Sequence, residues 1–258
     1  MNDSVLLGAI GAVGGAVVGR FLNGWIVRLP ESDSAKPGSR CPKCGHQPRW
    51  MDKVPILSWL RLGGRCRVCR HPMHRFEPLV ELAMAVLWAG MAVHFGCTLE
   101  ALGGAVFGTL LTGIVMTDAR VQIIPDEFSL GGLVLGLLFA AVMGGPAATD
   151  ALRGAAVGFG PLWLIGGLAS WLLKKDALGG GDPKMMAMVG AFLGWQGALL
   201  TIFLGALTGT LVFAPLRLFS KREVLIPFGV FLAIGAATTY LVGPEILAWY
   251  RGYLGVAP

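Results

Sequence analysis

Charged residues are scarce in this chain of 258 residues, and the scarcity decides its class. Only 14% of the residues are charged and 55% are hydrophobic, whereas soluble domains carry about 25% charged residues. This apolar surplus excludes a disordered chain, and the long apolar runs without charge exclude a soluble domain built on one core. Five cysteines are too few for a disulfide scaffold. The sequence therefore predicts an all-α, polytopic membrane bundle.

A basic region is also missing in front of the first apolar run, so this run is not a signal peptide. It extends to Val27, which is too long for the core of a signal peptide, and we expect a first membrane-spanning helix here. We expect eight spans, with seven as the alternative, because the sixth is short and contains glycines, and only residues 195–197 mark its boundary with the seventh. The expected spans are residues 5–27, 78–96, 100–117, 128–144, 152–173, 184–199, 200–217 and 225–248.

Positive charge is concentrated in the polar segment between the first two spans. Residues 28–75 contain eleven Lys or Arg and three acidic residues, a net charge of +8, and the rest of the chain carries −2. The positive-inside rule predicts that this loop is cytoplasmic. Alternation through eight spans then places 18 of the 21 basic residues on the cytoplasmic side. In a membrane protein such a charge pattern directs topology, so we expect membrane lipid and no nucleic acid as a partner.

Glycine is abundant, with 39 residues, and it recurs at intervals of four within several expected spans. Small residues at this spacing allow two helix backbones to approach closely in lipid. We therefore expect the glycines to pack helices together. The pairs and triplets are Gly11/Gly15/Gly19, Gly104/Gly108, Gly132/Gly136, Gly154/Gly158, Gly190/Gly194 and Gly205/Gly209.

Two Cys-x2-Cys pairs lie in the basic loop, separated by 21 residues. Each pair can form a tight turn that holds two thiolates, and two such turns complete a tetrahedral zinc site. A cytoplasmic loop is kept reduced, which argues against disulfides, and so small a polar segment needs a metal to fold. The sequence predicts a structural zinc ion (Zn²⁺) bound by Cys41, Cys44, Cys66 and Cys69. Nearby histidines that could replace a ligand are His46, His71 and His74.

Two aspartates are expected at the cytoplasmic edge of the membrane. Asp118 ends the third span, and Asp182 opens the sixth after three glycines. Two carboxyl groups in a poorly hydrated site share a proton, so one can activate water while the other donates a proton to a peptide carbonyl. The alternative for Asp182 is a helix N-cap, because Pro183 follows it. Asp118 would oppose the dipole of its own helix, which a capping role does not explain.

Glu81 is a further ionisable residue just inside the second span. Carboxyl groups inside a membrane are candidates for function. For Glu81 two interpretations remain open, namely a structural ion pair with Arg20 or Arg75, and a functional role in binding.

Seven motifs spread over nearly the whole chain resemble those of the type IV prepilin peptidases, membrane aspartic proteases that also methylate their product. The motifs are residues 21–30 (FLNGWIVRLP), 54–60 (VPILSWL), 64–67 (GRCR), 78–81 (PLVE), 118–126 (DARVQIIPD), 179–184 (GGGDPK) and 227–229 (PFG). The sequence departs from the family pattern at Arg20 in place of serine, at the extra Glu77, at Arg120 in place of aspartate and at Val230 in place of proline.

The resemblance implies a peptidase in the inner membrane of a bacterium. It implies that Asp118 and Asp182 are catalytic and cut the short basic leader from type IV prepilins or pseudopilins at the cytoplasmic face. It implies S-adenosylmethionine as the co-substrate that methylates the new N-terminal amine. Gly181, Lys184 and Glu81 are then associated with the substrate or with the loop, and the functional alternative for Glu81 is binding of the substrate or of the methyl donor.

The expected organisation is a first helix over residues 1–27, a zinc-binding loop associated with methylation over 28–76, and a peptidase core over 77–258. The alternative function, from a different class, is a zinc-ribbon membrane scaffold without catalysis. In that case both aspartates would only cap or end helices.

Overall fold

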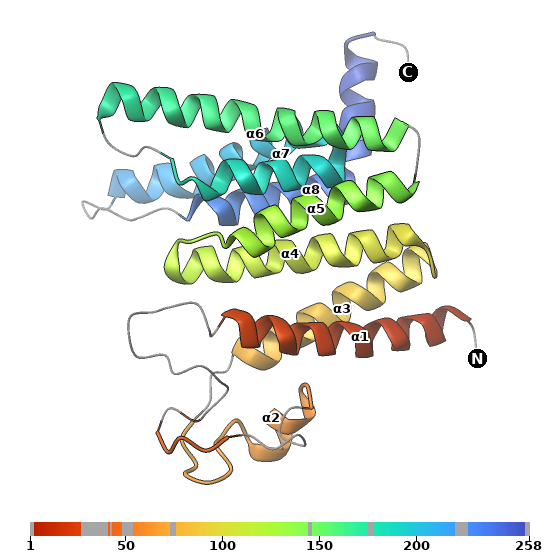
Figure 1. The fold of residues 1–258 in the computed structure, drawn as a ribbon, viewed down its shortest axis with the longest axis vertical. Helices are drawn as coiled ribbons and strands as arrows, with labels where there is room; N and C mark the ends of the chain where they lie inside the picture. The colour runs from red at the N-terminus through yellow and green to blue at the C-terminus, as the bar shows by residue number, and fades with distance from the viewer. Residues whose placement is uncertain are drawn as a thin grey trace. The chain divides into compact units, whose positions relative to one another are not determined.

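The computed structural model describes residues 3–26, 41, 43–47, 54–72, 76–143, 146–174, 178–219 and 227–255. Every regular element in these residues is an α-helix (Figure 1). Seven of the described helices are long and apolar enough to cross a membrane. The predicted class, an all-α protein that crosses the membrane several times, is confirmed.

The chain forms two compact units, Met1–Thr109 and Leu110–Pro258. The first unit contains α1 (Asp3–Ile26), the short α2 (Leu57–Leu62), α3 (Phe76–Phe95) and the first part of α4 (Leu99–Val121). The second contains the rest of α4, α5 (Asp126–Met143), α6 (Pro146–Leu173), α7 (Gly181–Phe219) and α8 (Phe228–Tyr253).

Glycines bring helix backbones into direct contact, as their spacing predicts. In the first unit, a Cβ atom on Gly19 of α1 would lie 2.8 Å from the Cα atom of Glu81 in α3. In the second unit, Gly154 of α6 and Gly190 of α7 face each other so closely that neither has room for a side chain. Because lipid does not drive apolar helices together as water does, such close packing is a main source of helix association.

Helix α7 contains both of the expected spans 184–199 and 200–217. Its backbone leaves the helical conformation at Gly194, where φ is 71° and ψ is 178°, a conformation that glycine adopts without steric cost. The segment before Gly194 begins at Gly181 and rises about 20 Å at 1.5 Å per residue. It is shorter than a usual span of about 30 Å.

The segment of α7 after Gly194 runs antiparallel to α8. Thr201 donates a hydrogen bond to Thr239 with an O–O distance of 3.1 Å, and the ring of Phe213, later in α7, packs on Phe231, earlier in α8, at 5.4 Å. The first turns of α7 and α8 both contact Ile124. The direction of α7 therefore reverses at Gly194 (Figure 1), and the seven helices contain eight apolar segments.

The first segment of α7 forms the centre of the second unit. Met185, Met186, Met188 and Val189 are fully buried, and Met188 packs against Gly132 of α5. A segment enclosed on every side holds the residues of its first turn in fixed positions. Asp182 is one of these residues.

Candidate active site and metal centre

Asp118 lies near the C-terminal end of α4 and faces the N-terminus of α8. Its side chain is buried, with 5% of the residue exposed, and its Oδ2 atom accepts a hydrogen bond from the backbone N–H of Val230 at 3.1 Å. A Cβ atom on Gly229 would lie 2.9 Å from the same oxygen, so glycine is needed there to admit the carboxyl group. The free amides at the start of α8 stabilise a negative charge on Asp118. This offsets the unfavourable interaction of that charge with the C-terminal end of the α4 dipole.

Asp182 lies in the first turn of α7, beside Asp118. It is 7% exposed, and its carboxyl group lies within electrostatic range of Asp118. Gly181 and Gly229 each face Ile124, so this one side chain lies between the helix starts that bear the site. The structure therefore brings together the two aspartates that the sequence singled out, from positions 64 residues apart.

The amide of Val230 and the side chain of Ile124 were missed as parts of this site. Residues 227–229 were noted only as a family motif, and nothing in the sequence indicated that the motif faces Asp118. Ile124 lies two residues before Asp126 and had no polar feature to single it out.

Lys184 lies on the exposed rim of the site. Its Nζ atom forms an ion pair of 2.7 Å with Oδ1 of Asp126, the first residue of α5, with side chains 37% and 56% exposed. An ion pair this exposed contributes less than about 1 kcal/mol to stability. Lys184 therefore links the starts of α5 and α7 without entering the buried carboxyl pair.

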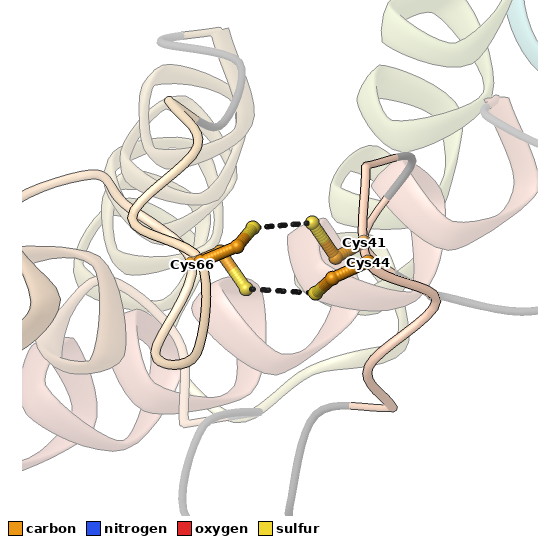
Figure 2. Close-up of side chains that lie close together, drawn as sticks. Cys41, Cys44 and Cys66 are labelled. Carbon is orange, nitrogen blue, oxygen red and sulfur yellow. Dashed lines mark hydrogen bonds between the residues drawn. The ribbon is translucent and has the colours of Figure 1, made fainter.

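The four cysteines of the first unit gather into one cluster. Their sulfur atoms all lie within 4.8 Å of one another, and two of the distances, shown as dashed lines in Figure 2, are 3.5 and 3.8 Å. Zn–S bonds of about 2.3 Å in a tetrahedron place sulfurs roughly 3.8 Å apart. The cluster in the described residues contains no histidine, and His74 lies outside them. Its members are Cys41, Cys44, Cys66 and Cys69.

The two cysteine pairs share the same pattern of backbone hydrogen bonds. The N–H of Cys41 donates to the carbonyl of His46, and the N–H of Gly45 donates to the carbonyl of Cys41. In the second pair, the N–H of Cys66 donates to the carbonyl of His71, and the N–H of Arg70 donates to the carbonyl of Cys66. These N–O distances are 3.0 and 2.8 Å at Cys41 and 2.8 and 3.1 Å at Cys66. The fourth residue after each has positive φ, 68° at Gly45 and 57° at Arg70. Each turn points its two thiols inward, as a metal site requires.

The thiols of the cluster differ in how readily they ionise. The backbone N–H of Cys44 lowers the pKa of Cys41 to about 6, and the backbone N–H of Cys69 lowers the pKa of Cys66. The amide of His71 lowers the pKa of Cys69, but burial and the neighbouring thiols outweigh it and raise that pKa to about 12. Four thiolates this close repel one another, so a bound cation is needed to ionise them all. The donor set fits a thiophilic divalent metal.

Glu81 is buried in a charged network that joins α1, α3 and the loop before α2. Its Oε1 atom lies 3.4 Å from a guanidinium nitrogen of Arg20, and its Oε2 atom accepts the backbone N–H of Ile56 at 2.7 Å. The same guanidinium nitrogen lies 3.2 Å from Oε2 of Glu77, and Asn23 donates to the Glu77 carbonyl at 2.8 Å. Of the two expected partners of Glu81, Arg20 is in contact. The other, at position 75, lies outside the described residues.

We predict that Glu81→Ala lowers the free energy of unfolding by about 2–3 kcal/mol, because it leaves the Ile56 amide unbonded and removes a buried partner of Arg20. Glu77→Ala is the matched control, since Glu77 is more exposed and bonds to the same arginine; its effect should stay below about 1 kcal/mol. Thermal unfolding of both variants in detergent tests this. Equal losses in the two variants would contradict the assignment of Glu81 as the central acceptor.

Two family models match the chain. Residues 13–95 match the Bacterial Peptidase A24 N-terminal domain, and residues 105–214 match the Type IV leader peptidase family. Among curated relatives, the prepilin leader peptidase/N-methyltransferase of Stutzerimonas stutzeri is 35% identical, over 92% of this chain and 91% of the relative. That of Pseudomonas aeruginosa is 35% identical over 93% and 92%, and that of Xanthomonas campestris pv. campestris is 31% identical over 94% and 93%. No solved structure matches the chain.

The seven apolar helices and the cysteine cluster of the described residues, together with these matches, define the class as a multi-pass membrane enzyme. The chain belongs to the type IV leader peptidase family. It is an aspartic peptidase with an associated methyltransferase activity. The resemblance inferred from the sequence motifs is confirmed.

Proposed function

We propose that this enzyme removes the short basic leader from type IV prepilins or pseudopilins, with Asp118 and Asp182 as its catalytic residues. One observation carries the proposal: two buried carboxyl groups from distant parts of the chain lie within electrostatic range of each other, and one of them is held by the amide of Val230. The family match supports the reaction class, and the names of the relatives support the substrate.

In the proposed mechanism the two aspartates share one proton. The ionised carboxylate takes a proton from a water molecule, which attacks the carbonyl carbon of the scissile peptide bond. The protonated carboxyl donates its proton to the carbonyl oxygen. The tetrahedral intermediate collapses when the carboxyl that took the proton from water delivers it to the amide nitrogen, which leaves as the amine. One hydroxyl group of the intermediate returns its proton to the other carboxylate as the new carbonyl forms, so the pair again shares one proton. The Val230 N–H keeps the Asp118 carboxyl in position through these steps.

We also propose that cleavage takes place at the cytoplasmic face of the inner membrane. The basic residues of the chain gather on one side under the positive-inside rule, and the loop of residues 28–75 has a net charge of +8. Both aspartates fall at the same edge of the membrane as that loop in the expected topology.

The four cysteines would hold a zinc ion in the loop, which folds around it. Four thiolates close the coordination shell and leave no position for water, so the zinc would have a structural role. S-adenosylmethionine would supply the methyl group for the new N-terminal amine, as the names of the relatives suggest. We associate this activity with residues 28–76 and assign no residue to the methyl transfer itself.

The test is to incubate the purified, metal-loaded enzyme in lipid vesicles with a prepilin-type precursor and to follow the intact mass of the precursor. We expect the leader mass to be lost with or without S-adenosylmethionine, and one methyl group to be gained only when it is present. Vesicles with no enzyme are the control. A precursor that stays uncut by folded, zinc-loaded enzyme would contradict the proposal.

A further inference from the structure

Glu81 is a buried carboxyl group that the proposed cleavage mechanism does not use. Only 2% of the residue is exposed, and its two oxygens face different partners. Oε1 lies 3.4 Å from a guanidinium nitrogen of Arg20, and Oε2 accepts the backbone N–H of Ile56 at 2.7 Å. This burial leaves the carboxyl group no surface for a substrate or a methyl donor. Any effect of Glu81 on the chemistry is therefore exerted through its two partners.

The backbone that carries Glu81 is held firmly between two helices. Gly15 of α1 faces the Met84 carbonyl of α3 so closely that it has no room for a side chain. A Cβ atom on Gly19 would lie 2.8 Å from Cα of Glu81. Backbones packed this closely leave no space for one helix to shift against the other. Glu81 therefore extends its carboxyl group from a rigid support.

Ile56 has a backbone conformation that its side chain disfavours. Its φ is 59° and its ψ is −53°, which is an outlier for a β-branched residue. Such a conformation persists only where the surrounding structure imposes it. The bond from the Ile56 N–H to Glu81 does so, because it fixes the orientation of the peptide unit that precedes Ile56. Glu81 therefore holds the point at which the chain enters α2.

A short, ordered segment connects Ile56 to the cysteine cluster. The N–H of Leu60 donates to the Ile56 carbonyl at 3.0 Å, and the N–H of Gly64 donates to the Trp59 carbonyl at 2.9 Å. Gly64 is buried against the Trp59 ring, which a Cβ atom would approach to 2.8 Å. Cys66 follows two residues later and belongs to the cluster. The hydrogen bond to Glu81 thus connects α3, through residues 56–66, to the metal-binding part of the loop.

We propose that Glu81 is a positioning residue for methyl transfer, which holds the zinc-binding loop in place against α1 and α3 and binds neither substrate nor methyl donor itself. This inference rests on the proposed association of the methyltransferase activity with residues 28–76. Arg20 and Ile56, the partners of Glu81, lie in the first unit, whereas both candidate catalytic aspartates lie in the second. Loss of the Glu81 carboxyl group should therefore slow methylation and spare leader cleavage.

Methyl transfer is sensitive to the placement of the reacting groups. The lone pair of the new N-terminal amine forms a bond to the methyl carbon of S-adenosylmethionine, the carbon–sulfur bond breaks with its electron pair left on sulfur, and the nitrogen then releases one proton to water. A displacement of about 1 Å can slow a reaction by about a hundred-fold. A loop that loses its contact with Glu81 can therefore keep its fold and its zinc and still methylate slowly.

The test removes the acceptor of the Ile56 N–H and follows both activities on one precursor. Glu81→Met removes the carboxyl group and keeps an unbranched side chain of similar length. Glu81→Gln is the conservative variant, because its amide oxygen can still accept the Ile56 N–H. Glu77→Gln is the matched control: it lies one helical turn earlier and changes a bond to the same arginine. The full-length, zinc-loaded enzymes are compared in lipid vesicles with S-adenosylmethionine, and intact mass separates loss of the leader from gain of a methyl group.

For Glu81→Met we expect kcat for methylation to fall at least about ten-fold. Leader cleavage, the zinc content and the KM for S-adenosylmethionine should each stay within about three-fold of the wild type, because the loop keeps its own fold. Glu81→Gln should restore methylation to within about three-fold of the wild type. Glu77→Gln should leave both activities within the same limit, since its ion pair is more exposed.

Four results would overturn the inference and leave the peptidase proposal standing. They are unchanged methylation in Glu81→Met, an equal loss of cleavage and methylation, a fall in zinc content, and a raised KM for S-adenosylmethionine with kcat unchanged. Failure of Glu81→Gln to restore methylation would also contradict it, because the acceptor would not be what matters. If the wild type cuts the precursor and adds no methyl group, the proposed methylation is wrong and this inference falls with it. If the wild type leaves the precursor uncut, the peptidase proposal itself is wrong.

Discussion

Asp182→Asn is expected to slow leader cleavage on the order of a thousand-fold, because an amide can neither take a proton from water nor return it to the substrate. The substitution preserves the shape of the side chain, so the core around Met185 and Met186 should stay intact. Asp118→Asn should slow cleavage to a similar extent for the same reason. Its side-chain oxygen can still accept the Val230 N–H, so the start of α8 should keep its position. The measurement is the rate of leader loss, followed by intact mass in lipid vesicles.

Asp126→Asn is the matched control for both variants. Asp126 lies at the same rim and has the same side-chain chemistry, but it is exposed and pairs with Lys184. Its loss should change the cleavage rate by less than about three-fold, because exposed ion pairs contribute little. If Asp182→Asn cleaves at the wild-type rate and loses only about 1 kcal/mol of stability, Asp182 is a helix cap. The capping alternative would then be correct.

Cys66→Ser is expected to abolish zinc binding. Cys66 is the buried cysteine of the cluster, and structural zinc sites of this kind bind with about 10–16 kcal/mol, so the loss of one thiolate is a large perturbation. Elemental mass spectrometry should find about one zinc per chain in the wild type and almost none in the variant. Protease digestion should then cut the loop around residues 41–72 faster than in the wild type.

Cys97→Ser provides the control for metal loading. Cys97 is exposed and lies outside the cluster, so this variant should keep its zinc and its resistance to protease. Wild-type protein without metal, or full zinc loading in Cys66→Ser, would refute the structural zinc site.

Two of the departures from the family pattern explain each other in the structure. Arg20 replaces a common serine and Glu77 is an extra acid, and their side chains pair at 3.2 Å. A charge placed inside a helix interface is costly unless it is paired. Arg20 therefore has two acidic partners across the interface, Glu77 and Glu81, and the extra glutamate adds to a pairing that Glu81 alone would provide.

The sequence by itself determined the membrane class and the cysteine cluster, and it singled out the two buried aspartates at the helix ends. Each of these rests on a property of short segments: hydropathy over about 20 residues, the Cys-x2-Cys spacing that places two thiols in one turn, and the aspartates at the ends of apolar runs. Such properties need no knowledge of distant contacts, which is why they could be predicted.

Only the tertiary structure decided the reversal at Gly194, the amide partner of Asp118 and the contact of Arg20 with Glu81. Gly194 is one of 39 glycines, and its positive φ depends on how the two segments of α7 pack. Val230 is 112 residues from Asp118. In lipid, helices associate through close packing and polar contacts between distant segments, and a linear pattern of apolar residues does not specify these contacts.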